Sequence, residues 1–339
     1  MVSTSATPAS LSEPRTLGEG SRLVVWQAGE ATEHSTPTRA DVEAALAEPA
    51  ARLWLDLLDP SDEDLAALAA LLGLHPLIAS EITAANKRPK LVQVEDALHV
   101  ILFALTFEGE VHSAEIDAIL GKRYLITAHD RGWDPLRAPM LARGAGPVLG
   151  RGADYLLYAL ADSIVDGYFP VLDHLADEID VLQDDVIART SSWTLDRLFG
   201  LKRELIDLRR ATSPAREVFN QLTNRDLGLI SKSTIVYFRD VYDHLLRVSD
   251  EVDNYRELVS GTLDVYLTSV NNELSRIMKR LTGVTVLLAG IGAIGGIFGM
   301  SQATPALAGQ EGSGFYLVTA ACVVLAAGAA LFLRRIDWI

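Results

Sequence analysis

Side chains that can line a wet path recur every three or four residues along one segment near the C-terminal end of the chain. That spacing places them on a single face of a helix. The face consists of Ser275, Met278, Leu281, Thr282, Thr285, Ala289, Gly292, Gly296 and Gly299. Its hydroxyls and small residues suit a pathway for hydrated ions. The same stripe also suits contact with lipid or with neighbouring helices, particularly at the glycines.

This stripe runs into the first of two uncharged segments. Residues 281–300 and 315–333 contain no charged side chain, and at about 1.5 Å per residue each covers roughly the 30 Å hydrocarbon core of a bilayer. Basic residues flank the pair of segments: Arg276, Lys279 and Arg280 precede it, and Arg334 and Arg335 follow it. Residues 301–314 between them contain no Lys or Arg. The sequence therefore predicts two transmembrane helices with both termini in the cytoplasm.

Composition narrows the class of protein further. The formal net charge of -15 argues against a phosphate-binding surface and a nucleic-acid partner, and favours a surface that attracts cations. The single cysteine, Cys322, excludes an internal disulfide and indicates a reducing compartment for the soluble part. The sequence has no His-Glu-x-x-His motif, Walker loop or nucleophile elbow. We therefore do not expect an enzyme.

The segments before the membrane divide into three parts. Residues 1–20, rich in Ser, Thr, Pro and Ala, predict a disordered tail. Residues 21–150 alternate short β-rich and helical runs, which predicts an α+β cytoplasmic domain, a mixed sheet with flanking helices. Residues 151–280 show apolar residues at helical spacing and predict a helical domain and a stalk helix. Breaks are expected near Gly150, Ser191-Ser192, Ser213-Pro214 and Gly228.

The stalk helix should be very long. No proline occurs between Ser231 and the end of the first apolar segment, so one helix of roughly 70 residues and about 100 Å is expected to enter the bilayer. Its apolar stripe needs neighbours, which favours assembly of identical subunits. The remaining parts are an external loop (301–314), a second transmembrane helix (315–335) and a cytoplasmic tail (336–339).

Several stretches in this order give the chain a family resemblance. They are LWLDL, LHPLIASEI followed by RPKL, YFRDVYDHLLRV, LVSGTLDVYLTSVNNEL, MKRLTGVTV and GIFGM. Over about residues 50 to 300 the chain resembles the CorA family of magnesium and cobalt channels. The resemblance implies a homopentameric funnel in which five first transmembrane helices line a central pore.

The resemblance also implies roles for residues of the pore. The family's Gly-Met-Asn at the outer end of the first span is Gly299-Met300-Ser301 here, which would form the selectivity element at the pore entrance. A serine hydroxyl is shorter than the Asn side chain and offers a different set of donors and acceptors. The identity of the ion held there is therefore open. Met278 and Leu281 would form a hydrophobic gate that closes by dewetting.

Acidic residues would sense the cation on the cytoplasmic side. By resemblance, Glu81 and Asp240 form a regulatory metal site between neighbouring subunits, with Asp264 as another stalk acid, although each is equally compatible with a solvated surface position. Arg334 and Arg335 would contribute to a basic ring near the membrane.

These observations predict a divalent-cation channel or transporter of the inner (plasma) membrane, gated by cytoplasmic cation. Mg²⁺ is the expected ion, with Co²⁺ or Zn²⁺ as alternatives. Because Ser301 replaces Asn, a zinc carrier or a poorly selective channel remains open, as does a non-conducting membrane sensor of metal. The expected partners are further copies of the chain, lipid and divalent cations.

Overall fold

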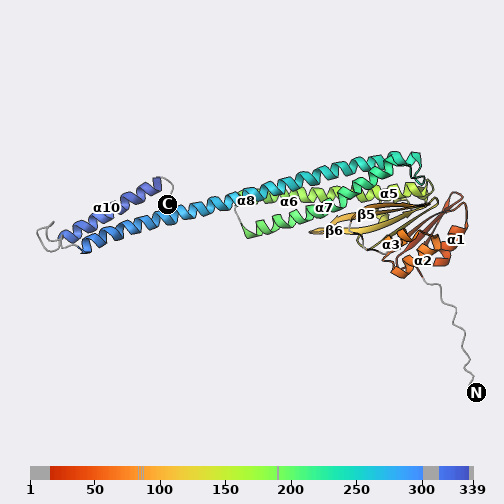
Figure 1. Cartoon of the computed structure of the whole chain (residues 1–339), viewed down its shortest axis with the longest axis horizontal. Helices are drawn as coiled ribbons and strands as arrows, with labels where there is room; N and C mark the ends of the chain where they lie inside the picture. The colour runs from red at the N-terminus through yellow and green to blue at the C-terminus, as the bar shows by residue number, and fades with distance from the viewer. Residues whose placement is uncertain are drawn as a thin grey trace, which may run out of the picture. The chain divides into compact units, whose positions relative to one another are not determined.

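The computed structural model describes residues 16–82, 84, 86, 88–188, 191–300 and 313–335 (Figure 1). Two compact units make up the chain: Met1–Leu182 with Asp196–Ser260, and Gln183–Leu195 with Gly261–Ile339. The sequence placed residues 16–20 in a tail, but Leu17 is buried and its amide donates to the Pro37 carbonyl at 2.9 Å. The packed part of the first unit therefore includes the last five residues of that tail.

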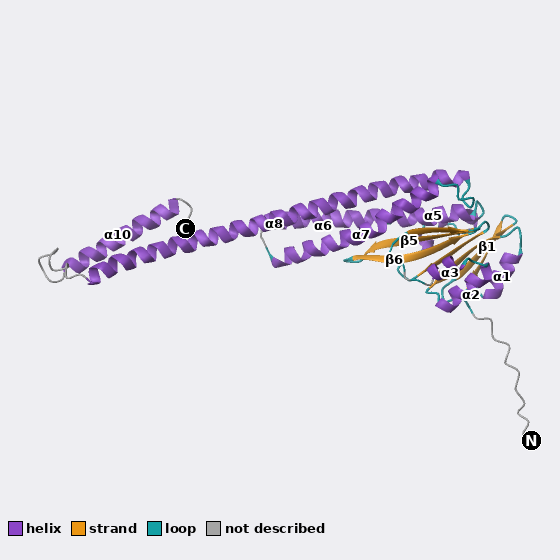
Figure 2. Ribbon diagram, viewed as in Figure 1, coloured by secondary structure: helices purple, strands orange, loops and turns teal. Residues whose placement is uncertain are grey.

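A seven-stranded mixed sheet forms the centre of the first unit (Figure 2). Its strands are β1 (Arg22–Gln27), β2 (Glu30–Ser35), β3 (Arg52–Leu58), β4 (Lys90–Val94), β5 (Ala97–Phe107), β6 (Val111–Leu120) and β7 (Tyr124–His129). Their order across the sheet is β2-β1-β3-β7-β6-β5-β4, and only β3 and β7 pair in parallel. The expected mixed sheet is thus confirmed. The sequence did not predict β2, because its residues, EATEHS, are all exposed and show no apolar alternation.

Three short helices cover one face of this sheet. α1 (Arg39–Ala47) and α2 (Asp62–Leu72) each begin with a capping box, made by Thr38 with Asp41 and by Ser61 with Asp64. They pack with α3 (Pro76–Ile82) on alternate residues of the strands. The shared core contains Leu53, Leu55, Leu57, Val42, Leu65, Leu68, Ile78, Ile82 and Ile126.

The opposite face carries a buried polar network beneath α5 (Ala153–Asp166), which packs on β3, β5, β6 and β7. Trp54 Nε1 donates to Thr127 Oγ1 at 3.0 Å, and Thr127 Oγ1 donates to Asp56 at 2.6 Å. His129, the last residue of β7, completes the network at 3.1 Å from the same Asp56 oxygen. These polar groups fix the only parallel pairing in the described sheet. Before α5 the chain forms two 3₁₀ turns, η1 (Pro135–Arg137) and η2 (Pro139–Leu141), and the short helix α4 (Gly146–Leu149).

Long helices follow: α6 (Tyr168–Ala188), α7 (Ser192–Asn224) and α8 (Lys232–Met300). The expected break at Ser213-Pro214 is wrong, because α7 continues through Pro214. A proline removes one backbone donor, but Ala211, Ala215 and Val218 are buried around it, and this packing offsets the loss. The very long stalk helix is confirmed, since α8 is one helix of 69 residues.

The second unit contains the C-terminal part of α8 and α10 (Ser313–Arg335). The two helices face one another across an apolar cavity of about 400 Å³, lined by Gly290, Ile294, Cys322, Ala326 and neighbouring residues. Within the described residues, the segment Lys232–Gly296 is the helix long and apolar enough to cross a membrane. Large apolar side chains on it are exposed in the single chain: Val265, Leu267, Leu274, Ile277, Val284, Val286 and Leu288.

Candidate cation sites

The gate residues predicted from the sequence lie on the exposed surface of α8. Met278 is 58% exposed and Leu281 is 66% exposed. Thr285 donates its hydroxyl hydrogen to the Leu281 carbonyl at 2.8 Å, so its oxygen lone pairs remain available to water or to a hydrated ion. Ser275, Thr282, Ala289, Gly292 and Gly296 are also exposed on this helix. The stripe from Ser275 to Gly296 is therefore exposed within one chain.

Gly292 and Gly296 of the stripe have no packing role within the described part of the single chain. A Cβ added at Gly292 or Gly296 would meet nothing within 4 Å. Small residues that make no packing contact within their own chain are suited to close packing against another helix. They also suit the wall of a wide, water-filled pore. Of the predicted pore entrance, Ser301 lies outside the described residues, and for Gly299 and Met300 the structure describes only the helical backbone of α8.

Among the described residues, no hydrogen bond, ion pair or ligand cluster joins Glu81 to Asp240 within one chain. Glu81, on α3, accepts a hydrogen bond from Lys90 Nζ at 2.7 Å, so its charge is already partly balanced. The Asp240 carboxylate, on α8, is 68% exposed. Asp264 is exposed too, and belongs to the other compact unit.

Asp240 instead belongs to a cluster that joins α5 and α8. Ligand atoms of Asp162, Asp166 and His244 all lie within 4.8 Å of one another. His244 Nδ1 is 3.1 Å from an Asp166 oxygen, and its Nε2 is 4.0 Å from an Asp240 oxygen. Each helix contributes two of the four residues at a spacing of i and i+4, one turn apart on the same face. We call these four residues the α5–α8 cluster.

Electrostatics make the α5–α8 cluster receptive to a cation. The pKa of Asp162 is raised to about 6, mainly by burial and also by the charges of Asp166 and Asp240, while His244 lowers it. Burial, with the charges of Asp162 and Asp240, also raises the pKa of the neighbouring Tyr158. A bound dication would offset this crowding of negative charge. Carboxylate oxygens suit Mg²⁺, and an added imidazole suits Co²⁺ or Zn²⁺.

Sequence reasoning found Asp240 but missed the other three members of this cluster. The available signal was the pair of i, i+4 spacings, Asp162 with Asp166 and Asp240 with His244. Such spacing predicts a shared helix face, but it does not say which two helices dock. Only the packing of α5 and α8 supplies that information.

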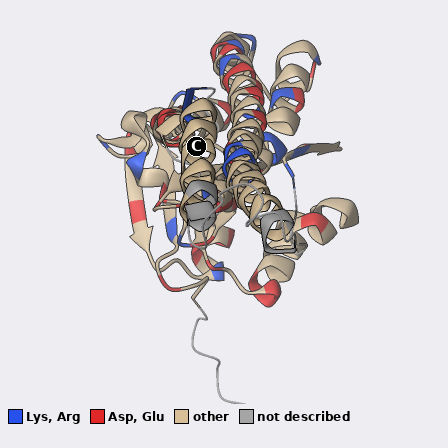
Figure 3. Ribbon diagram, turned by 90° about the vertical axis from the view of Figure 1, so that its left-hand side faces the viewer, with Lys and Arg blue, Asp and Glu red and all other residues tan. Residues whose placement is uncertain are grey.

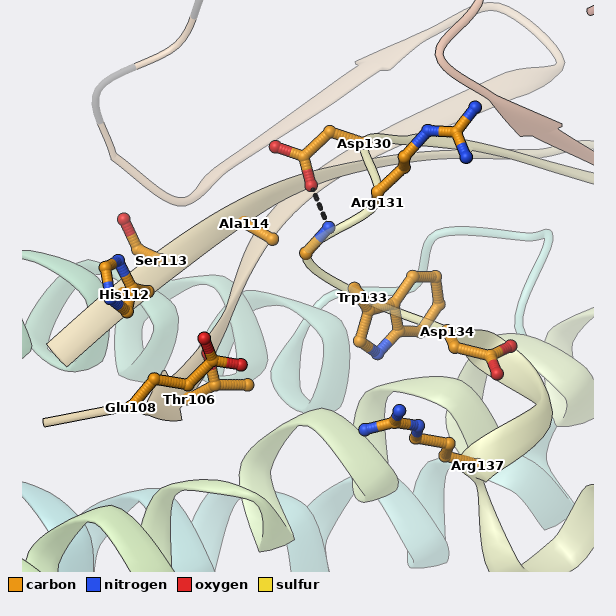
Figure 4. Close-up of a pocket in the computed structure, with 11 residues that line it drawn as sticks. Thr106, Glu108, His112, Ser113, Ala114, Asp130, Arg131, Trp133, Asp134 and Arg137 are labelled. Carbon is orange, nitrogen blue, oxygen red and sulfur yellow. Dashed lines mark hydrogen bonds between the residues drawn. The ribbon is translucent and has the colours of Figure 1, made fainter.

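A second cavity, of about 530 Å³, lies at the ends of β5, β6 and β7 (Figure 4). The indole of Trp133 stands near its middle, with the Arg137 guanidinium on one side and Glu108 and His112 on another. Arg131, which also lines it, pairs with Asp59 at 3.0 Å. Because both signs of charge line this cavity, it lacks the concentrated negative field of the α5–α8 cluster.

The predicted basic ring residues occupy the end of α10. Arg334 and Arg335 lie in its last turn and are exposed. Positive charge at the C-terminal end of a helix interacts favourably with the helix dipole. Of the acidic residues on α6, Glu178 is engaged by Arg197, whose guanidinium also donates to Glu204 at 2.9 Å. Asp177, Asp180 and Asp184 are exposed.

The first unit has a mixed sheet and, on two of its helices, a cluster of side chains that could hold a cation. One of these helices, α8, continues into an apolar segment with hydroxyl side chains. The chain belongs to the CorA family: the family described as CorA-like Mg²⁺ transporter protein matches residues 50–335. This is a family of transporters rather than of enzymes.

Individual relatives agree with this assignment. The chain is 35% identical over 274 residues to the cobalt/magnesium transport protein CorA of Thermotoga maritima, covering 79% of this chain and 77% of that protein. It is 28% identical to the CorA protein of Methanocaldococcus jannaschii, over 85% of this chain and 91% of that one. The complete structure of the M. jannaschii CorA magnesium transporter superposes with a TM-score of 0.79 at 26% identity, covering 94% and 98% of the two chains.

Proposed function

We propose that this protein conducts divalent cations across the inner membrane, with Mg²⁺ as the main ion and Co²⁺ as a second. The observation that carries the proposal is the family match over residues 50–335, which includes both the α5–α8 cluster and the hydroxyl stripe of α8. The names of the relatives, cobalt/magnesium transport proteins, support the choice of ions.

Conduction requires assembly, and we propose a homopentamer in which five α8 helices enclose the path. The exposed apolar and hydroxyl side chains of α8 support this, because a single chain leaves them uncovered. Ions would enter at Gly299 and Ser301, pass the glycine-rich half and meet the gate at Met278 and Leu281. A ring of serine hydroxyls would bind the hydrated ion differently from a ring of Asn side chains. Transport of Zn²⁺ or poor selectivity is therefore the alternative.

Topology follows from the placement of basic residues. Both 281–300 and 315–335 would cross the bilayer, with the two termini and the basic ring of Arg334 and Arg335 on the cytoplasmic side. The described helix α10 is 23 residues long, which is sufficient for a second crossing.

Cytoplasmic cation would regulate the channel through acidic sites. We propose that Glu81 and Asp240 meet between neighbouring subunits, with Asp264 as a further stalk ligand, and that Asp162, Asp166 and His244 extend the site at Asp240 within each subunit. A cation that binds the closed arrangement more tightly than the open one would shift the population toward the closed channel.

Flux into liposomes tests the proposal directly. Purified protein is reconstituted with a Mg²⁺-sensitive dye inside the vesicles, and external Mg²⁺, Co²⁺ or Zn²⁺ is added at low internal metal. We expect entry of Mg²⁺ and Co²⁺ that a bulky charged substitution, Met278→Arg, abolishes. The matched control is Asn254→Arg, which places the same side chain on α8 at an exposed polar position outside the stripe. Absence of flux for every ion at every internal metal concentration would favour the non-conducting sensor and refute conduction.

A further inference from the structure

Arginines from three separate segments of the first unit gather around one cavity. The cavity, of about 920 Å³, is lined by Arg88, Arg209, Arg210, Arg256, Ile206, Ser213 and Pro214. Arg88 follows α3, the next two arginines lie on α7, and Arg256 lies on α8. No acidic residue is among the lining residues that the structure describes. The volume is within the range of small-molecule sites.

Nearby carboxylates neutralise only part of this charge. Asp253 lies 3.0 Å from Arg256 and 3.5 Å from Arg209, using the same oxygen for both. Asp207 pairs with Arg210 at 3.0 Å, one helical turn away. Four guanidinium groups against two carboxylates leave two positive charges in excess. Arg88 is exposed and has no ion-pair partner among the described residues.

Such an excess is unexpected in a protein whose net charge is -15. In the view of Figure 3, blue basic residues and red acidic ones are interspersed along the ribbon. Guanidinium groups bind phosphate oxygens through paired N–H donors, and several of them around one cavity favour a ligand with several phosphate charges. The overall negative charge, which led us to expect no phosphate-binding surface, does not extend to this local surface.

We propose that this arginine cavity binds a soluble polyphosphate anion, such as the triphosphate chain of a nucleotide. Arg88 and Arg256, from two separate segments, bind the phosphates, and the anion displaces Asp253 from Arg209 and Arg256. Ser213 offers a hydroxyl donor, while Ile206 and Pro214 form an apolar wall. The inference concerns binding alone and does not depend on cation conduction.

Calorimetric titration of the full-length protein in detergent, without divalent cations, tests the proposal with sodium tripolyphosphate, ATP and adenosine as probes. Tripolyphosphate and ATP should bind and adenosine should not, and binding should weaken as salt is raised. Arg88→Ala and Arg256→Ala should each weaken binding about tenfold or more, the loss expected when a charge-assisted hydrogen bond is removed. Arg88→Lys should lose less.

Two further variants make the result decisive. Arg39→Ala is the matched control, because Arg39 is an exposed arginine paired with Glu43 on α1; it should bind as the parent does. Asp253→Asn should bind more tightly, since it removes the competing carboxylate. Elution volume and melting temperature confirm folding for every variant. No binding of tripolyphosphate by the parent, equal losses in Arg39→Ala and Arg88→Ala, or weaker binding by Asp253→Asn would overturn the proposal.

Discussion

Neutralising Asp162 should change the stability of the cation-free and cation-bound protein in opposite directions. Without cation, the Asp162 charge is opposed by burial and by the carboxylates of Asp166 and Asp240. Asp162→Asn relieves a like-charge pair at i, i+4 and part of the burial penalty, together about 0.5–1 kcal/mol. For a unit of this size, that should raise the melting temperature by about 1–4 °C.

With cation present, the same substitution should reduce stabilisation. A cation at 100 times its dissociation constant stabilises the folded state by about 2.7 kcal/mol. Loss of one charged ligand should weaken binding about 10- to 30-fold, because dication affinity depends strongly on the number of charged oxygens. At the same concentration the stabilisation then falls to about 1 kcal/mol. The Mg²⁺- or Co²⁺-induced rise in melting temperature should therefore shrink by about 3–6 °C.

Intrinsic tryptophan fluorescence during a thermal ramp measures both effects on purified protein, first with a chelator and then with Mg²⁺ or Co²⁺. Asp250→Asn is the matched control, since Asp250 is an exposed carboxylate on α8 that lies outside the α5–α8 cluster. An Asp162→Asn protein that keeps the full cation-induced shift refutes the assignment of this cluster as a cation site. So does an equal loss in Asp250→Asn.

Three other outcomes follow from described contacts or from the sequence. Thr127→Val should destabilise the protein by about 2–4 kcal/mol in urea unfolding, because it leaves the buried Trp54 donor and an Asp56 acceptor without this partner; a change under 0.5 kcal/mol would contradict the network. Burial lowers the pKa of His129, but the hydrogen bond and charge of Asp56 raise it more, so the net pKa lies above 6.5. The stability from protonated His129 should be complete below pH 6.5 and lost as pH rises through the raised pKa, a loss that is absent in His129→Gln. Ser301→Asn should increase the preference for Mg²⁺ over Zn²⁺ in liposome flux, and unchanged preference would count against a selectivity ring.

Elements with a strong internal pattern could be predicted from the sequence, whereas those defined by their neighbours could not. The 69-residue α8 followed from an uninterrupted, proline-free pattern. β2 was not predicted, because an exposed edge strand needs no apolar alternation. Pro214 misled the prediction, since the packing of Ala211 and Ala215 overrides the local cost of a proline inside α7.

The sites divide in the same way. Asp240 could be proposed from a linear motif, but Asp162 lies 78 positions earlier in the chain, and only the docking of α5 on α8 makes them neighbours. Glu81 was predicted, by resemblance, to be a metal ligand between subunits, and within one chain it pairs with Lys90; a cation would have to replace that ammonium group. The arginine cavity opposes the prediction from net charge, because net charge averages over a surface on which local charge can have either sign.

Residues of the α5–α8 cluster and of the proposed gate belong to the same helix. Asp240, His244, Met278 and Leu281 all belong to α8, and between Asp240 and Leu281 the helix contains no proline and a single glycine, Gly261. A Cβ at Gly261 would meet nothing within 4 Å, so no close packing requires glycine there. We expect cation binding at the α5–α8 cluster to act on the proposed gate through α8, because the chain of this helix carries residues of both. It can do so only if the cation binds one position of α8 more tightly than another.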